Sequence, residues 1–218
     1  MAAAAQPLGV LPEVTDFCRL FVCRHPELAV EADGVVVGSG EARLGRRGQD
    51  TVLLWLRAFG RLRVDAVFAA DRPQCQDPAE AIAMAKGLEV AVEERLRDQD
   101  MGSWQGRRWD EIARDDPVRA REFFAEFGAG TAPGGESLGD AVERMLSWWN
   151  GISPALAGKA IVAVAPGGLI SGFATAMLGM RLSRAPSLSL PHGGIGVLDL
   201  FANGARVSAW NALALAGE

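Results

Sequence analysis

Short, fully apolar runs alternate along this chain with segments in which apolar residues recur at helical spacing. The clearest run, residues 161–165, is apolar throughout and leads through Pro166-Gly167-Gly168 into a helical segment. Strands of this kind are buried on both faces. Their alternation with helices predicts a sheet with helices on both sides. We therefore expect an α/β sandwich of three layers around a mostly parallel, six-stranded sheet.

Apolar periodicity and turn residues give the expected elements. Strands are predicted at residues 18–23, 65–70, 88–92, 161–165, 195–201 and 206–210, with the last two forming a hairpin around Asn203-Gly204. Helices are predicted at 44–61, 77–86, 109–127 and 137–152, with Asp77 and Pro78 starting the second, and a final helix ends at Leu178. The domain is expected to span residues 17–218, with an inserted helical cap at about 99–135 and a flexible tail at 1–16.

Charge and cysteine content exclude several classes of protein. The chain has 22 Lys and Arg against 27 Asp and Glu, a net charge of −5, which argues against a nucleic-acid binder. No apolar run approaches the length of a membrane span, and the N-terminus lacks a secretory signal pattern. Three cysteines without a signal peptide favour a cytoplasmic protein with reduced thiols. No cysteine and histidine cluster is present, so no metal site is expected.

Polar residues follow several of the predicted strands, and they define a candidate site. In open parallel sheets, ligands bind beyond the carboxyl ends of the strands. That rule groups Arg24-His25, residues 71–75, Asp98 and residues 166–168 in one place. The chain has just two histidines, His25 and His192, so any imidazole chemistry must use one of them.

The order of five short motifs resembles the histidine phosphatase superfamily, whose fold is called phosphoglycerate-mutase-like. The resemblance covers about residues 17–211. The motifs are Arg24-His25-Pro26, the segment from Ala69 to Cys75, the segment from Leu96 to Gly106, Pro133-Gly134-Gly135-Glu136-Ser137 and Ala165-Pro166-Gly167-Gly168. In that family one histidine takes the phosphoryl group, two arginines and a second histidine surround the phosphate, and a carboxylate protonates the leaving group.

Carried over position by position, the resemblance implies His25 as nucleophile and Arg24 as the first arginine. It implies Asp98 as the acid, with Glu136 as a nearby alternative. The second arginine falls on Gln74 and the second histidine falls on Pro166. Proline has no donor at all, and a glutamine cannot form a bidentate charged pair. The resemblance therefore implies a degenerate phosphate pocket.

Other residues could fill the gaps. Arg72 lies two positions from Gln74 and could turn inward, although residues two apart on a helix point to different sides. His192 is interpreted either as a surface loop residue or as a replacement acid or base in the pocket. Pro166, Gly167 and Gly168 precede or begin a helix, and such an end favours anions.

Three functions remain open at this stage. The first is an enzyme of this fold with little phosphatase activity, repurposed for acid–base or non-phosphoryl chemistry on a small metabolite, with an anionic one among the options. The second is a weak phosphatase acting through phospho-His25 on a specific phosphorylated small molecule. The third is a pseudoenzyme that binds a ligand or a partner protein. No cofactor, metal, nucleic acid or membrane is expected, and a homodimer is left open.

Overall fold

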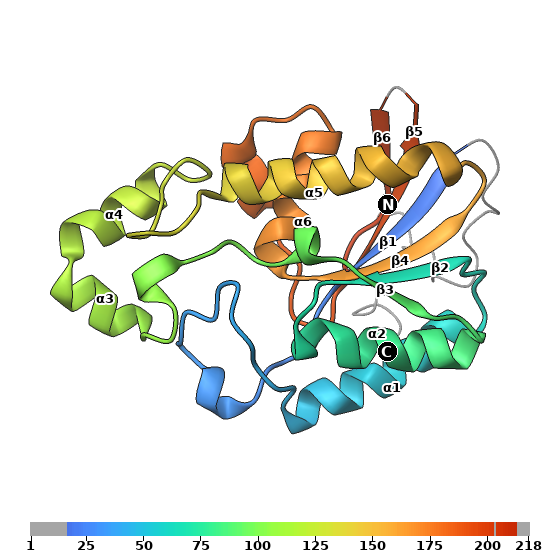
Figure 1. Cartoon of the computed structure of the whole chain (residues 1–218), viewed down its shortest axis with the longest axis horizontal. Helices are drawn as coiled ribbons and strands as arrows, with labels where there is room; N and C mark the ends of the chain where they lie inside the picture. Colours follow the sequence, from blue (N-terminus) through green and yellow to red (C-terminus); the bar gives the residue numbers. More distant parts are fainter. Residues whose placement is uncertain (1–16, 203, 213–218) are drawn as a thin grey trace, which may run out of the picture.

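The computed structural model describes residues 17–202 and 204–212, which form one sheet between two helical layers with further helices at one end (Figure 1). The strands are β1 (Cys18–Arg24), β2 (Ala66–Ala69), β3 (Val90–Val92), β4 (Ala160–Ala165), β5 (Ile195–Phe201) and β6 (Gly204–Ala209). The α-helices are α1 (Arg46–Gly60), α2 (Pro73–Lys86), α3 (Trp109–Asp115), α4 (Pro117–Ala125), α5 (Leu138–Ile152) and α6 (Gly167–Met177). Short 3₁₀ turns are η2 (Val30–Ala32), η3 (Glu94–Leu96), η4 (Gly102–Trp104), η5 (Ser153–Ala155) and η6 (Leu182–Leu188).

The six strands lie in the order β3-β2-β4-β1-β5-β6. The pairs β3–β2, β2–β4 and β4–β1 are parallel, whereas β5 and β6 join as antiparallel strands. The expected mostly parallel, six-stranded α/β sheet is confirmed. Because β1 lies between β4 and β5, its carboxyl end at Arg24 emerges in the middle of the sheet, beside the start of α6.

Helices cover both faces of the sheet. Helices α1 and α2 pack on one face, and α5 and α6 pack on the other (Figure 1). Large side chains from these layers are buried against the strands, among them Trp55 on α1 and Trp148 on α5. Helix α5 begins at its predicted position because Ser137 and Asp140 form a capping box, in which each side chain accepts a hydrogen bond from the other's backbone.

Two predicted helix boundaries are wrong. Helix α2 begins at Pro73 rather than at Asp77, and Pro78 lies inside it. Both prolines fit the first turn of a helix by sequence, and the earlier one starts it. The predicted helix 109–127 is two helices, because Pro117 forces Asp116 out of helical geometry and Asp116 then caps α4 through the backbone N–H of Arg119. The turn residue Asn203 of the predicted hairpin lies outside the described residues, as does the predicted tail.

Helices α3 and α4 lie beyond one end of the sheet (Figure 1). Their inner faces form a second hydrophobic cluster, separate from the main core, around Trp104 and Ile112. This cluster gives the region between residues 99 and 135 its own packing. We refer to residues 99–135 as the cap. Among the described residues, no helix is long and apolar enough to cross a membrane.

A buried ion pair joins β1 to β5. Arg19 donates to both carboxylate oxygens of Asp199 at 2.7 and 3.0 Å, and both side chains are almost completely buried. Asp199 also accepts hydrogen bonds from Arg206 at 2.6 Å and from Ser208. Removing one partner of a buried pair leaves the other charge in a low-dielectric interior.

We therefore expect Asp199→Ala to lower the free energy of unfolding by about 3 kcal/mol, measured by urea denaturation. Arg206→Ala is the matched control, because Arg206 bonds to the same carboxylate but is 56% exposed. Exposed pairs contribute at most about 1 kcal/mol. Equal losses in the two variants would contradict this account.

Candidate active site

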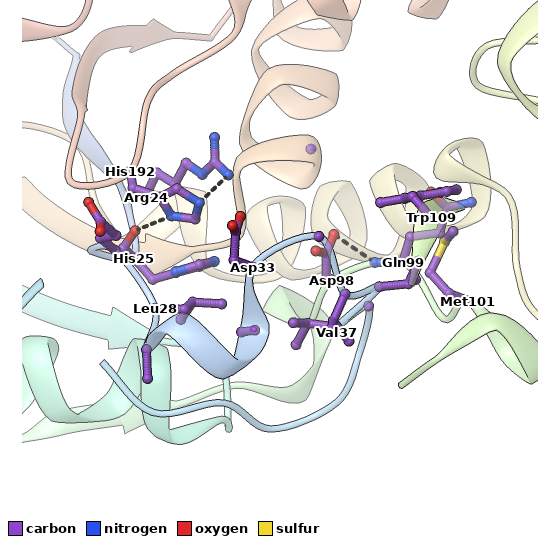
Figure 2. A pocket seen from close by; sticks show the side chains of 18 of the residues that line it. Arg24, His25, Leu28, Asp33, Val37, Asp98, Gln99, Met101, Trp109 and His192 are labelled. Carbon is purple, nitrogen blue, oxygen red and sulfur yellow. Dashed lines mark hydrogen bonds between the residues drawn. The ribbon is translucent and has the colours of Figure 1, made fainter. Parts of the chain in front are cut away.

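One large cavity opens at the carboxyl ends of the strands, between the sheet and the cap. Its volume is about 1220 Å³, above the range of about 300–1,000 Å³ that small-molecule pockets usually show. Arg24, His25 and Asp98 line it, as do the loop after β1 and part of the cap. In Figure 2, Arg24, His25 and His192 lie at one end of this space, and Met101 and Trp109 lie at the other. We call the first the polar end.

His25 is buried, and its hydrogen bonding fixes which ring nitrogen is free. The Nδ1 atom lies 3.0 Å from the carbonyl oxygen of Pro26, and a carbonyl can only accept. Nδ1 therefore carries the hydrogen, and Nε2 keeps a free lone pair. Burial is the main reason that the pKa of His25 falls to about 4, with smaller contributions from His192 and Arg24. At neutral pH, His25 is thus a neutral imidazole that can act as base or nucleophile.

His192 also lines the cavity, with its ring centroid 5.0 Å from that of His25. Its Nδ1 atom lies 3.3 Å from the backbone carbonyl of His25, and its Nε2 atom lies 2.9 Å from Nη2 of Arg24. A guanidinium can only donate, so Nε2 of His192 accepts and Nδ1 donates. Burial and then the charge of Arg24 lower the pKa of His192. His192 is therefore neutral, and both of its ring nitrogens already have partners.

The Arg24 guanidinium is held by the protein itself. Besides His192, it donates to the carbonyl oxygen of Leu190 at 2.7 Å. Its side chain crosses directly over Gly167, where a Cβ atom would lie 2.7 Å from Cδ and Nε of Arg24. Position 167 must therefore be glycine for Arg24 to occupy this place. The buried Nε atom of Arg24 has no partner in the structure.

Asp98 is one of the carboxyl groups that line the cavity. Burial raises its pKa to about 6, although a hydrogen bond from the backbone N–H of Gln99 at 2.9 Å and the charge of Arg24 oppose the rise. A carboxyl group with such a pKa is protonated in a large fraction of molecules at mildly acidic pH. Asp98 can therefore donate a proton, the task of a general acid.

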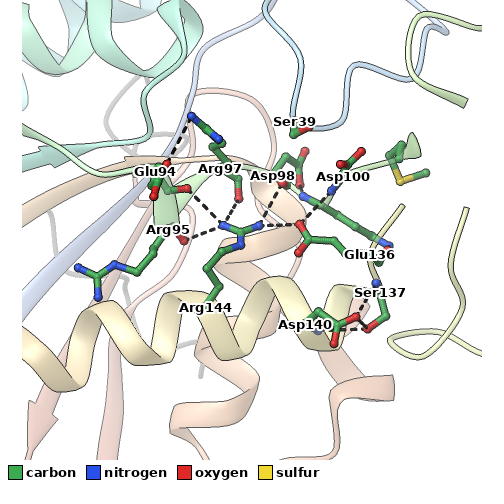
Figure 3. Close-up of polar contacts among 12 residues, drawn as sticks. Ser39, Glu94, Arg95, Arg97, Asp98, Asp100, Glu136, Ser137, Asp140 and Arg144 are labelled. Carbon is green, nitrogen blue, oxygen red and sulfur yellow. Dashed lines mark hydrogen bonds and ion pairs between the residues drawn. The ribbon is translucent and has the colours of Figure 1, made fainter. Parts of the chain in front are cut away.

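Glu136 does not line the cavity, although its negative charge contributes to the raised pKa of Asp98. It pairs with Arg144 at 2.6 Å and accepts from the backbone N–H of Asp100 at 3.0 Å (Figure 3). Arg144 also donates to backbone carbonyl groups of residues 95, 97 and 98, at 2.9 to 3.3 Å (Figure 3). Arg144 and Glu136 thus hold the segment that carries Asp98. No sequence pattern pointed to Arg144, because its role depends on contacts between distant segments.

A family model for the histidine phosphatase superfamily (branch 1) matches residues 20–213. The chain belongs to this superfamily. A protein of Cronobacter sakazakii described as a probable phosphoglycerate mutase, GpmB, is 23% identical over 88% of this chain and 89% of its own length. Glucosyl-3-phosphoglycerate phosphatase of Mycobacterium tuberculosis is 27% identical over 82% of this chain and 81% of its own. The crystal structure of the alpha-ribazole phosphatase from Shigella flexneri has the same fold, with a TM-score of 0.82, 18% identity and coverage of 89% and 96%.

Gln74 occupies the position at which the resemblance to the superfamily places the second phosphate-binding arginine. Gln74 is 3% exposed and does not line the cavity. It accepts from the backbone N–H of Ala42 at 3.0 Å and donates to the carbonyl of Gly40 at 2.9 Å. Arg72 also lies outside the cavity lining and donates to the carbonyl of Ser39 at 2.7 Å. Both side chains thus hold the loop at residues 39–42.

Pro166 and Gly167 do not line the cavity, whereas Gly168 does. Pro166 is the N-cap of α6 and makes no side-chain hydrogen bond there. A Cβ atom at Gly168 would lie 3.8 Å from a carboxylate oxygen of Asp98. The positive end of the α6 dipole therefore faces a carboxyl group of the protein.

Acidic groups balance the cations of this cavity. Among the described residues that line it, the cations besides Arg24 are Arg46 and Arg47, both exposed at the start of α1. Four acids also line it: Glu27, Glu31, Asp33 and Asp98. Asp33 points into the same space as Arg24 and Asp98 (Figure 2). The cavity therefore lacks the excess of positive charge that would favour a phosphate dianion.

Thiol and metal chemistry have no basis among the described residues. Cys18, Cys23 and Cys75 are buried and unpaired, and burial raises the pKa of each thiol. A protonated, buried thiol is a poor nucleophile. Within the described ranges, no group of three or more His, Cys, Asp and Glu residues could hold a metal ion.

Proposed function

We propose that this member of the superfamily is an enzyme that uses His25 and Asp98 for acid–base chemistry on a small molecule, and that it is a poor phosphomonoesterase. One observation carries the proposal. At the polar end of the cavity, the cationic side chain is Arg24, and its two Nη atoms are engaged by Leu190 and His192.

Phosphoryl transfer depends on donors that neutralise the charge on the transferred group. The resemblance to the family places two of them at Gln74 and Pro166. Gln74 is engaged with the 40–42 segment and Pro166 has no donor. Loss of one such donor costs about 3–4 kcal/mol in the transition state. The carboxylates Asp33 and Asp98 would further oppose a phosphate dianion.

Acid–base chemistry needs fewer groups, and the cavity holds them. Nε2 of His25 is free to take a proton from water or substrate. Asp98, when protonated, can return a proton to the leaving group. The proton then passes from His25 back to Asp98 through solvent, and the starting state is restored. In this scheme His192 and Gly167 position Arg24.

The pH dependence follows from the two pKa values. Below about pH 4, His25 is protonated and cannot act as base. Above about pH 6, Asp98 is ionised and cannot act as acid. We therefore expect a bell-shaped profile of kcat/KM with its maximum between these values, measured by ethanol release from ethyl butyrate, whose poor leaving group needs the acid. A profile that rises steadily up to pH 8 would contradict Asp98 as the acid.

The test compares two chromogenic probes. Cleavage of p-nitrophenyl butyrate needs the base but no acid, because nitrophenolate leaves unprotonated, whereas cleavage of p-nitrophenyl phosphate needs several cationic donors around the phosphate. We expect measurable turnover of the ester. We expect turnover of the phosphate to be at least about 10²-fold below that of the mycobacterial glucosyl-3-phosphoglycerate phosphatase in the same assay. Phosphate turnover within tenfold of that relative would overturn the proposal.

A weak phosphatase that forms phospho-His25 is the second candidate. Two observations favour it: His25 keeps a free Nε2 atom, and a relative with 27% identity is named as a phosphatase. The two candidates are distinguished by mixing the protein with a radiolabelled phosphomonoester, stopping the reaction rapidly without acid, and measuring the label on the protein. A labelled, acid-labile protein that is absent in His25→Ala would favour the phosphatase.

A further inference from the structure

The end of the cavity away from His25 is lined by apolar side chains. Val35 and Val37 line it from the loop after β1, and Met101, Trp109, Phe123 and Phe127 line it from the cap. Among the described cap residues that line this space, none carries a charge. A second phosphate or carboxylate of a ligand would therefore meet no charged side chain among these lining residues of the cap. We call this region the apolar end.

The wall of the apolar end is formed in advance. The loop and the cap are joined by backbone hydrogen bonds from Val36 to Arg107 at 2.8 Å, from Gly106 to Val36 at 2.9 Å and from Trp109 to Gly34 at 3.0 Å. These bonds hold the valine side chains opposite the cap. A rigid, preformed pocket binds without the cost of ordering its own loops.

Aromatic packing holds the opposite wall. The rings of Trp109 and Phe123 lie 6.0 and 5.3 Å from the ring of Trp104, which is fully buried behind them. Trp109 and Phe123 are themselves only partly buried, so part of each ring remains free. At the mouth, Phe127 is 37% exposed and Val30 is 80% exposed. Contiguous exposed apolar surface in a concave site is typical of ligand binding.

We propose that the apolar end binds an uncharged, hydrophobic group of the substrate, aromatic or aliphatic, so that the substrate is amphipathic. Its polar, reacting group would lie at His25 and Asp98, which rests on the proposed function. The size of the cavity fits this arrangement, because about 1220 Å³ exceeds what a small polar metabolite fills. The line of residues from His25 past Val37 to Trp109 gives the direction of the bound molecule (Figure 2).

Binding can be tested without knowledge of the substrate. The uncharged fluorophore N-phenyl-1-naphthylamine is titrated into the full chain, and we expect saturable 1:1 binding with increased emission. Val37→Asp should weaken binding at least tenfold, and Trp109→Leu should weaken it and remove energy transfer from that indole. Met84→Asp is the matched control, because Met84 is 80% exposed and does not line the cavity.

The outcomes separate this inference from the proposed function. His25→Ala should keep full affinity for the fluorophore, since the imidazole lies at the polar end. Absence of saturable binding, or equal binding in Val37→Asp, Trp109→Leu and Met84→Asp, would overturn the inference while leaving ester turnover untouched. In the reverse case, fluorophore binding that depends on Val37 without any ester turnover would support the apolar end and reject the proposed function.

A kinetic series adds a second readout. If p-nitrophenyl esters are substrates, KM for the octanoate should be at least tenfold below that for the acetate, because burial of each additional methylene strengthens binding. The difference should disappear in Val37→Asp. A KM that does not change with chain length would contradict a hydrophobic subsite.

Discussion

His25→Ala is expected to lower turnover of p-nitrophenyl butyrate by about 10³-fold, the usual contribution of a well-placed base. The reason is that His25 has the free, neutral ring nitrogen at the polar end, while both ring nitrogens of His192 are engaged. Steady-state rates at pH 5, where His25 is neutral, give the comparison.

His192→Ala is the matched control, since it removes the chain's other imidazole. It should cost about tenfold, because it releases Arg24 and does not remove the base. His192→Gln, which keeps an acceptor, should recover part of that loss. Both histidine variants must retain the circular dichroism and urea midpoint of the parent. Full activity in His25→Ala would leave only a ligand-binding role or a site elsewhere.

Gln74→Arg combined with Pro166→His is expected to raise hydrolysis of p-nitrophenyl phosphate by at least about 10²-fold, since each donor contributes about 10²–10³. Position 166 has φ −69° and ψ 152°, which a histidine adopts without strain. The ester activity should not rise in parallel, because it does not depend on cationic groups around a phosphate.

The control is Gln74→Leu with Pro166→Ala. This variant loses the same glutamine hydrogen bonds to residues 40 and 42 and gains no cation. Any gain that it shows would come from a looser loop rather than from phosphate binding. If the cationic variant and this control have equal phosphate turnover, then missing cations do not limit phosphoryl transfer in this chain.

The sequence predicted the parts of the fold that depend on local signals. Apolar runs located β1 and β4, and apolar residues at helical spacing located α5. It misplaced the start of α2 because two prolines five residues apart carry the same signal. It missed the break at Pro117. Apolar residues recur at helical spacing across this position, but the residue before a proline avoids helical geometry, so one helix ends and another begins there.

The residues of the candidate site were likewise predictable only in part. Chain order and the strand-end rule were sufficient to expect Arg24, His25 and Asp98 together, and the structure brings all three to one cavity with His192. They could not show where a side chain points once it has a competing partner. Glu136 pairs with Arg144, and Gln74 bonds to residues 40 and 42, so both lie outside the lining.

The backbone bonds between the loop after β1 and the cap bear on how molecules enter and leave. Residues 34–36 cannot swing away alone, since that would break three hydrogen bonds to residues 106–109 at once. We therefore expect loop and cap to move as a single body if the cavity opens. Substitutions where the cap joins the rest of the domain, at about residues 99 and 135, should then change turnover at a distance from the reacting groups.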